Sequence, residues 1–135
     1  MKLAEKIVVD ASVVLAVILN EPEKSGIIAA TQEGILLAPG CLPWEVGNAF
    51  SAMLKRRRLG AEEALAGLDV FESIPIQEST VDLKSALKLS KRHDIYAYDA
   101  YYLELALKGG MPLLTLDGRM AEVAEKEGIT VKEVL

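Results

Sequence analysis

Cysteine and aromatic residues are scarce in this 135-residue sequence, and no apolar run is long enough to cross a membrane. Cys41, the only cysteine, cannot form an internal disulfide and has no histidine at a zinc-site spacing, so we expect it to be a small apolar filler. The longest nearly uncharged stretch, residues 7–20, contains Asp10, and the N-terminus lacks the pattern of a signal peptide. We therefore expect a cytoplasmic protein with no membrane segment.

Positive charge is also in short supply. The net charge is −5 and the isoelectric point is near 4.9. This balance argues against broad adhesion to nucleic acid, because such binding depends on clustered Lys and Arg. The available cations are concentrated locally, above all in the basic tract Lys55–Arg58.

Apolar residues make up 51% of the sequence, enough to fill one core at this length, so we expect a single domain over residues 1–135. Short β-branched or apolar runs alternate with segments of helical periodicity, which predicts a three-layer α/β/α domain with a parallel central sheet. The helix expected at 80–93 is predicted to bury Leu83, Ala86, Leu87 and Leu89. The predicted strands are 7–9, 35–38, 74–76 (an edge strand because of Pro75), 112–116 and 129–131; the predicted helices are 12–19, 21–32, 42–58, 61–71, 80–93, 97–107 and 119–127.

Four acidic residues stand at strand ends or helix starts. Asp10 and Asp117 follow predicted strands, while Glu45 and Asp99 occupy the first turns of predicted helices. In a parallel sheet of this kind these positions point to one rim, so we expect the four carboxylates to converge. Each acid alone has an ordinary explanation as a helix cap, a favourable charge at a helix start or a turn residue.

The chemistry of the set favours a divalent cation. Asp99 lies in the otherwise uncharged stretch 96–103, where a carboxylate near the core needs a partner. Converging carboxylates repel one another unless a metal compensates, and all-oxygen ligation selects Mg²⁺ or Mn²⁺ over zinc. A metal-activated water then hydrolyses a phosphodiester without a side-chain nucleophile. Ser12 and Thr115 either assist the acids or cap helix ends. We interpret His93, the only histidine, as a solvated helix end and not a substrate contact.

Four segments resemble the acidic motifs of PIN domains, in order and in spacing. They are Val8–Ser12, Trp44–Ala49, Tyr98–Ala106 and Leu114–Asp117, which together span nearly the whole chain. The similarity is greatest to the short VapC-type toxins of toxin–antitoxin pairs. It implies a PIN-like fold, RNA cleavage, a homodimer and a VapB-type antitoxin that blocks the site. It also implies that the catalytic residues are Asp10, Glu45, Asp99 and Asp117, which bind Mg²⁺ or Mn²⁺, supported by Thr115 and Ser12.

Some features remain open under this resemblance. Arg119 occupies a position where some relatives have a further acid, so the number of metal ions, one or two, is undecided. The tract Lys55–Arg58 either guides an RNA backbone or contacts an acidic segment of the antitoxin. Of the adjacent Tyr101 and Tyr102, one is expected to face the core and the other a dimer interface or a stacked base.

Three rival functions fit parts of the same pattern. A response-regulator receiver also binds Mg²⁺ in an acidic pocket, but as a family it has paired acids after the first strand, where this sequence has Asp10 alone. A PIN-like binding module without chemistry would not need four unpaired carboxylates in a crevice. A housekeeping nuclease that processes ribosomal RNA cannot be separated from a toxin by these residues; a small adjacent open reading frame would separate the two.

Overall fold

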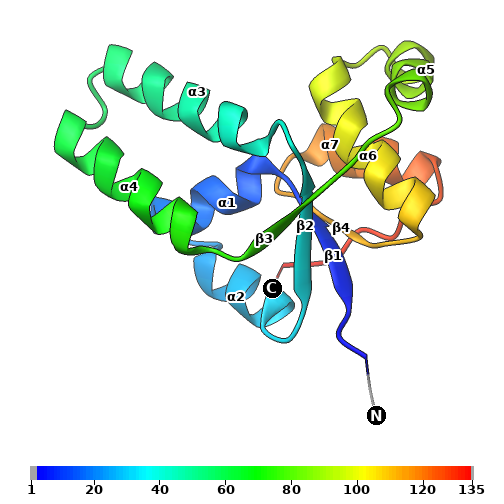
Figure 1. The fold of residues 1–135 in the computed structure, drawn as a ribbon, viewed down its shortest axis with the longest axis horizontal. Coiled ribbons are helices and arrows are strands. Elements are labelled where there is room, and N and C mark those ends of the chain that lie inside the picture. Colours follow the sequence, from blue (N-terminus) through cyan, green and yellow to red (C-terminus); the bar gives the residue numbers. More distant parts are fainter. Residues whose placement is uncertain (1–2, 135) are drawn as a thin grey trace.

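The computed structural model describes residues 3–134, which form a parallel sheet between two groups of helices (Figure 1). The strands are β1 (Lys6–Val9), β2 (Ile35–Pro39), β3 (Ile76–Ser79) and β4 (Leu113–Leu114). The helices are α1 (Ala11–Ile18), α2 (Lys24–Thr31), α3 (Leu42–Lys55), α4 (Ala61–Ser73), α5 (Leu83–His93), α6 (Ala97–Gly109) and α7 (Gly118–Lys126). None of the helices within residues 3–134 is long and apolar enough to span a bilayer.

All four strands run parallel, in the order β3-β2-β1-β4. The central strand β1 is buried on both faces, because Ile7, Val8 and Val9 are all at most 1% exposed. Such continuously apolar strands are typical of parallel sheets covered by helices on both sides. On one side α1 packs against α2, α3 and α4, and on the other α6 packs against β1, β2 and α5. The predicted three-layer α/β/α class is confirmed.

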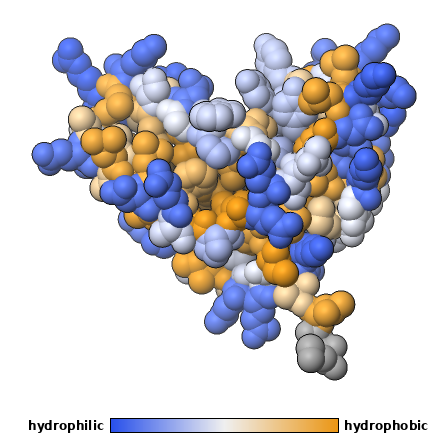
Figure 2. Space-filling model, viewed as in Figure 1, coloured by the Kyte–Doolittle hydropathy of each residue, from blue (hydrophilic) through white to orange (hydrophobic). Residues whose placement is uncertain are grey.

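The carboxyl ends of the strands meet at one rim of the sheet, and a notch opens there between the two helical layers (Figure 2). The chain leaves β1 and β2 at this rim and enters α1 and α3 directly. The strand order also reverses here, since β1 is followed in the chain by β2 on one side and pairs with β4 on the other. Ligands of open α/β sheets bind at such a reversal point.

Three predicted strands differ from those observed. The strand expected at 74–76 lies at Ile76–Ser79, after Pro75, and is at the sheet edge as predicted. The strand expected at 112–116 is only Leu113–Leu114, since the backbone of Leu116 donates to the side chain of Ser12 and not to a neighbouring strand. The strand expected at 129–131 is a single bridge between Leu113 and Val131.

The helix predicted from residue 80 begins at Leu83 because the side chain of Asp82 accepts hydrogen bonds from the backbone N–H groups of Lys84 and Ser85. The prediction that Leu83 and Leu87 face inward was wrong: each is 65% exposed. Helix α5 lies on α6 and not directly on the sheet, so only the narrow stripe with Ala86 and Leu89 is buried. Helices α2 and α3 are each a few residues shorter than predicted.

Gly67 in α4 is required by close packing. A β-carbon at this buried position would lie 2.7 Å from Cζ of Phe50 and 3.2 Å from Cγ2 of Ile18. We expect Gly67→Ala to lower the free energy of unfolding by about 1–3 kcal/mol through overpacking, although alanine is the better helix former.

Chemical denaturation measures this effect, with Gly47→Ala as the matched control. Gly47 is also helical, but a β-carbon added there would meet nothing within 4 Å beyond its own helix backbone and chain neighbours. We expect that variant to gain about 0.5–1 kcal/mol from helix propensity. Equal gains in both variants would contradict the packing argument.

Candidate active site

Asp10 is the buried centre of the site. It directly follows β1, caps the N-terminus of α1 and is only 5% exposed. Its Oδ1 accepts hydrogen bonds from the Ser12 hydroxyl at 2.6 Å and from the backbone N–H of Val13 at 3.2 Å, and its Oδ2 accepts one from the Thr115 hydroxyl. Burial raises the pKa of Asp10, and these hydrogen bonds oppose the rise. Its position is therefore fixed without a cationic partner.

Ser12 and Thr115 connect the ends of β1 and β4. The Ser12 hydroxyl accepts from the backbone N–H of Leu116 at 3.0 Å, and the Thr115 hydroxyl accepts from that of Asp117 at 3.0 Å. Because each hydroxyl accepts from the backbone, its proton is directed at Asp10. The sequence allows either assistance or capping for these two side chains, and the structure places both in contact with this carboxylate.

Glu45 is held by two donors from different parts of the chain. In the first turn of α3, its Oε2 accepts from the Tyr102 hydroxyl at 2.6 Å and from Sγ of Cys41 at 3.2 Å. Burial is the largest influence raising the pKa of Glu45; these two hydrogen bonds lower it, and the charges of Asp99 and Asp10 raise it further. The carboxylate therefore faces the other acids while its partners stay neutral.

Cys41 and Tyr102 are site residues that sequence reasoning missed. The interpretation of Cys41 as an apolar filler was incomplete: the half-buried side chain packs against the core, and its thiol also donates to Glu45. Burial, followed by contact with Glu45, raises the pKa of Cys41 to about 12, so the thiol stays protonated. Two signals were available, the four-residue spacing from Cys41 to Glu45 along a helix start and the need of a buried tyrosine hydroxyl for a partner.

Asp99 and Asp117 complete the acidic set from two further helix starts. Asp99, in the first turn of α6, has its pKa raised by burial and by the charges of Asp117 and Asp10. Asp117 is exposed and caps α7, accepting from the backbone N–H of Arg119 at 2.9 Å and of Met120 at 3.3 Å. The structure thus brings together all four predicted acids, each within electrostatic reach of at least one other.

The donor set suits a hard divalent cation. It is all oxygen and carries up to four negative charges, and the raised pKa values of three of its members reflect uncompensated burial and repulsion. Across residues 3–134, no group of three or more Asp, Glu, His or Cys side chains is placed to hold one metal ion, so in this arrangement an ion would have fewer than three of them as direct ligands. Water would therefore complete the shell, as it does in most Mg²⁺ sites in proteins.

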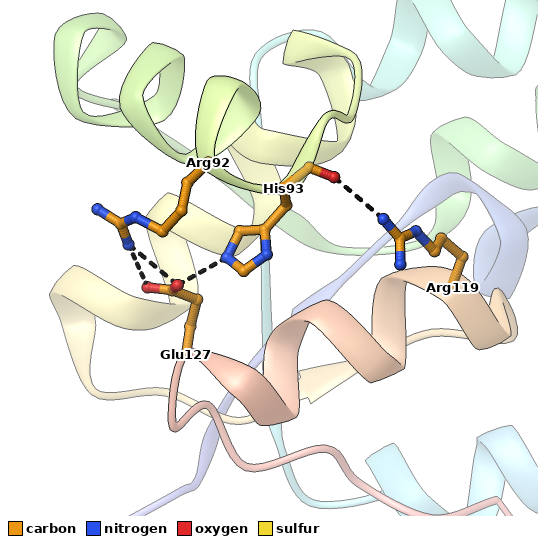
Figure 3. Close-up of polar contacts among 4 residues, drawn as sticks. All are labelled: Arg92, His93, Arg119 and Glu127. Carbon is orange, nitrogen blue, oxygen red and sulfur yellow. Dashed lines mark hydrogen bonds and ion pairs between the residues drawn. The ribbon is translucent and has the colours of Figure 1, made fainter.

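His93 and the basic tract lie apart from the acids. The interpretation of His93 as a solvated helix end was wrong, because its Nε2 lies 2.7 Å from Oε2 of Glu127 and its side chain is 12% exposed (Figure 3). The tract Lys55–Arg58 is exposed and begins at the far end of α3, roughly 15 Å along the helix from Glu45 at the standard rise per residue. No ion pair within residues 3–134 involves it.

Known proteins resemble this chain in sequence and in fold. The PIN domain family model matches residues 7–126. Ribonuclease VapC3 of Pyrobaculum aerophilum is 33% identical over 122 residues, which cover 87% of this chain and 93% of that relative. The structure of VapBC2 from Rickettsia felis was solved bound to a DNA fragment from its promoter. It has a TM-score of 0.67 at 12% identity, and the match covers 94% of this chain and 97% of the matched VapBC2 chain. VapC20 of Mycobacterium tuberculosis is described as a Sarcin-Ricin loop cleaving toxin. Its structure has a TM-score of 0.61 at 18% identity, and the match covers 86% of this chain and 93% of VapC20. The two solved structures share the fold.

The raised pKa of Asp99 predicts the direction in which the stability of the fold changes with pH. Its pKa is raised on folding, so the folded state binds more protons and stability falls as the pH rises above the ordinary carboxyl range. We expect Asp99→Asn to raise the melting temperature of the metal-free protein by about 2–4 °C at pH 7.5 and to have little effect at pH 4.

Thermal unfolding in EDTA across this pH range checks the expectation, with Asp69→Asn on the exposed side of α4 as the control. Added Mg²⁺ is expected to stabilise the original protein more than Asp99→Asn, since a ligand that binds only the folded state raises its stability. A lower melting temperature for Asp99→Asn at neutral pH would contradict this account.

Proposed function

The chain belongs to the PIN-domain family, among relatives of the VapC ribonucleases, and on this premise we propose that it is an endoribonuclease that acts as the toxin of a VapBC-type toxin–antitoxin pair. The observation that carries the proposal is the convergence of Asp10, Glu45, Asp99 and Asp117 at the carboxyl ends of β1 and β4 and at the starts of four helices. A family match over residues 7–126 and a relative named as a ribonuclease support it.

We propose further that the four carboxylates hold one or two Mg²⁺ or Mn²⁺ ions. The bound metal supplies a water of lowered pKa and neutralises charge at the scissile phosphate. The chain's own residues orient the ligands. Ser12 and Thr115 donate to both oxygens of Asp10, and Tyr102 donates to Glu45, so these carboxylates are fixed in orientation and keep lone pairs for a metal. Preorganised ligands of this kind avoid reorganisation during the reaction.

Assembly and cellular setting follow from the same assignment. We propose a single nuclease domain over residues 1–135 that works in the cytoplasm as a homodimer and is blocked by a VapB-type antitoxin. The Rickettsia felis VapBC2 structure supports the antitoxin, and the absence of a spanning helix in residues 3–134 is compatible with the location. A small open reading frame beside the gene favours the toxin, whereas its absence favours a housekeeping role in RNA processing.

We expect the purified chain, freed of any partner, to cleave labelled RNA in Mg²⁺ or Mn²⁺ and to lose cleavage in EDTA. Asp10→Asn and Asp99→Asn should each reduce the rate by at least about 100-fold, because each removes a metal-binding charge. Asp69→Asn serves as a charge-matched control with no expected effect. Equal cleavage by the original chain and both variants would refute the carboxylate mechanism. Metal and partner binding without any cleavage would favour a silent binding module.

The hydroxyls of Ser12 and Thr115, which donate to Asp10, allow a second test in which a smaller loss of activity is expected. We expect Thr115→Val and Ser12→Ala to lower kcat by about 10- to 100-fold and to raise the Mg²⁺ concentration needed for half-maximal rate, because groups that orient metal ligands have effects of this size. Thr31→Val is the matched control, since the Thr31 hydroxyl donates only within its own helix, to the Ile27 carbonyl at 2.8 Å. Unchanged metal dependence in Thr115→Val would contradict a positioning role.

A further inference from the structure

Arg119 is a cation at the rim of an acidic site. It lies in the first turn of α7, two residues after Asp117, and its backbone N–H donates to Oδ1 of that carboxylate at 2.9 Å. Its side chain is 55% exposed. An arginine so placed would be expected to turn toward the carboxylates and neutralise them, which would compete with a metal.

The guanidinium is instead held to one side. Its Nη2 donates to the backbone carbonyl of His93, the last residue of α5, at 3.0 Å (Figure 3). Burial and the charges of Asp117 and Asp10 raise the pKa of Asp99. Among the described residues the Arg119 guanidinium therefore contacts the end of α5 and Glu122 and donates to none of the four carboxylates, although its backbone lies two residues from Asp117.

His93 is itself fixed, which makes its carbonyl a firm anchor. Its ring contacts Glu127, the residue directly after α7, and Nη1 of Arg92 donates to both oxygens of the same Glu127 at 2.8 and 3.0 Å. The end of α5 is thus bound to both ends of α7. Arg92 places one nitrogen, Nη1, between the two oxygens of Glu127. Arg119 uses one of its five N–H donors on His93, and its Nη1 lies 3.9 Å from Oε1 of Glu122, an ion-pair distance beyond hydrogen-bond range.

We propose that Arg119 binds a backbone phosphate of the RNA next to the scissile one and so positions the substrate against the carboxylates. The inference rests on the proposed ribonuclease function. A polyanion that approaches four carboxylates needs a compensating cation, and a guanidinium with several unoccupied donors is suited to bidentate phosphate binding. Its anchor on His93 reduces the entropy lost when it engages the substrate.

Arg119→Ala and Lys126→Ala form a matched pair for the test. Both cations are on α7, both contact Glu122, and they are similarly exposed at 55% and 57%, but Lys126 is in the last turn, away from the rim. The measurements are kcat and KM for cleavage of a short single-stranded RNA at several salt concentrations, and the affinity of the same RNA in EDTA by fluorescence anisotropy.

We expect Arg119→Ala to raise KM and weaken RNA affinity by about 5- to 20-fold with kcat changed less than about 2-fold. The slope of log affinity against log salt should fall by about 0.7, the value for one phosphate contact on a single strand. Arg119→Lys should give an intermediate KM, since lysine keeps the positive charge but lacks the paired N–H donors with which a guanidinium binds phosphate. Lys126→Ala should match the original chain.

Other results would overturn the proposal. Unchanged KM and salt slope in Arg119→Ala, or the same change in Lys126→Ala, would show that Arg119 makes no particular phosphate contact. A loss of kcat alone with a lower melting temperature would indicate a purely structural tie between α5 and α7. If the original chain cleaves RNA and Arg119→Ala behaves identically, only this inference is refuted. If no metal-dependent cleavage occurs, the proposed function is refuted, and RNA affinity that depends on Arg119 would then show phosphate binding without a scissile bond beside it.

Discussion

Burial of the Asp10 carboxylate at the end of the central strand constrains everything around it. A charged group removed from water must have its oxygens hydrogen-bonded, and here the donors come from Ser12, Thr115 and the backbone of α1. None of these donors is a cation, so the carboxylate is stabilised in place without being neutralised. The turn after β4 is shaped by this requirement: Leu116 and Asp117 donate to the same two hydroxyls that donate to Asp10.

The buried carboxylates of the site lower the stability of the folded chain. Three carboxylates have raised pKa values because they are buried near one another. The packing beneath them compensates: Ile7, Val8 and Val9 of β1 are buried, and Tyr102 is 1% exposed while its hydroxyl reaches Glu45. Electrostatic strain of this kind is typical of functional sites and persists where the surrounding structure fixes the geometry.

The parts of the molecule that depend on local pattern could be predicted from the sequence. The run Ile7–Val9 and the helical periodicities determined the α/β class, and the positions of the four acids after strands and at helix starts indicated one rim. The predictions that were wrong concern residues whose contacts lie far away in the sequence. His93 could not be assigned without knowing that Glu127 lies beside it, and Leu83 and Leu87 were misassigned because the pattern does not say that α5 covers α6 instead of the sheet.

The contact between Thr115 and Asp10 joins residues 105 positions apart, and this separation sets an order of events during protein synthesis. At roughly 5–20 residues per second, the ribosome adds Thr115 about 5–20 s after Asp10. Until then the nascent chain carries Asp10, Glu45 and eventually Asp99 without the strand that closes the acidic cluster. The complete set of four carboxylates therefore cannot assemble until β4 and the start of α7 have been synthesised.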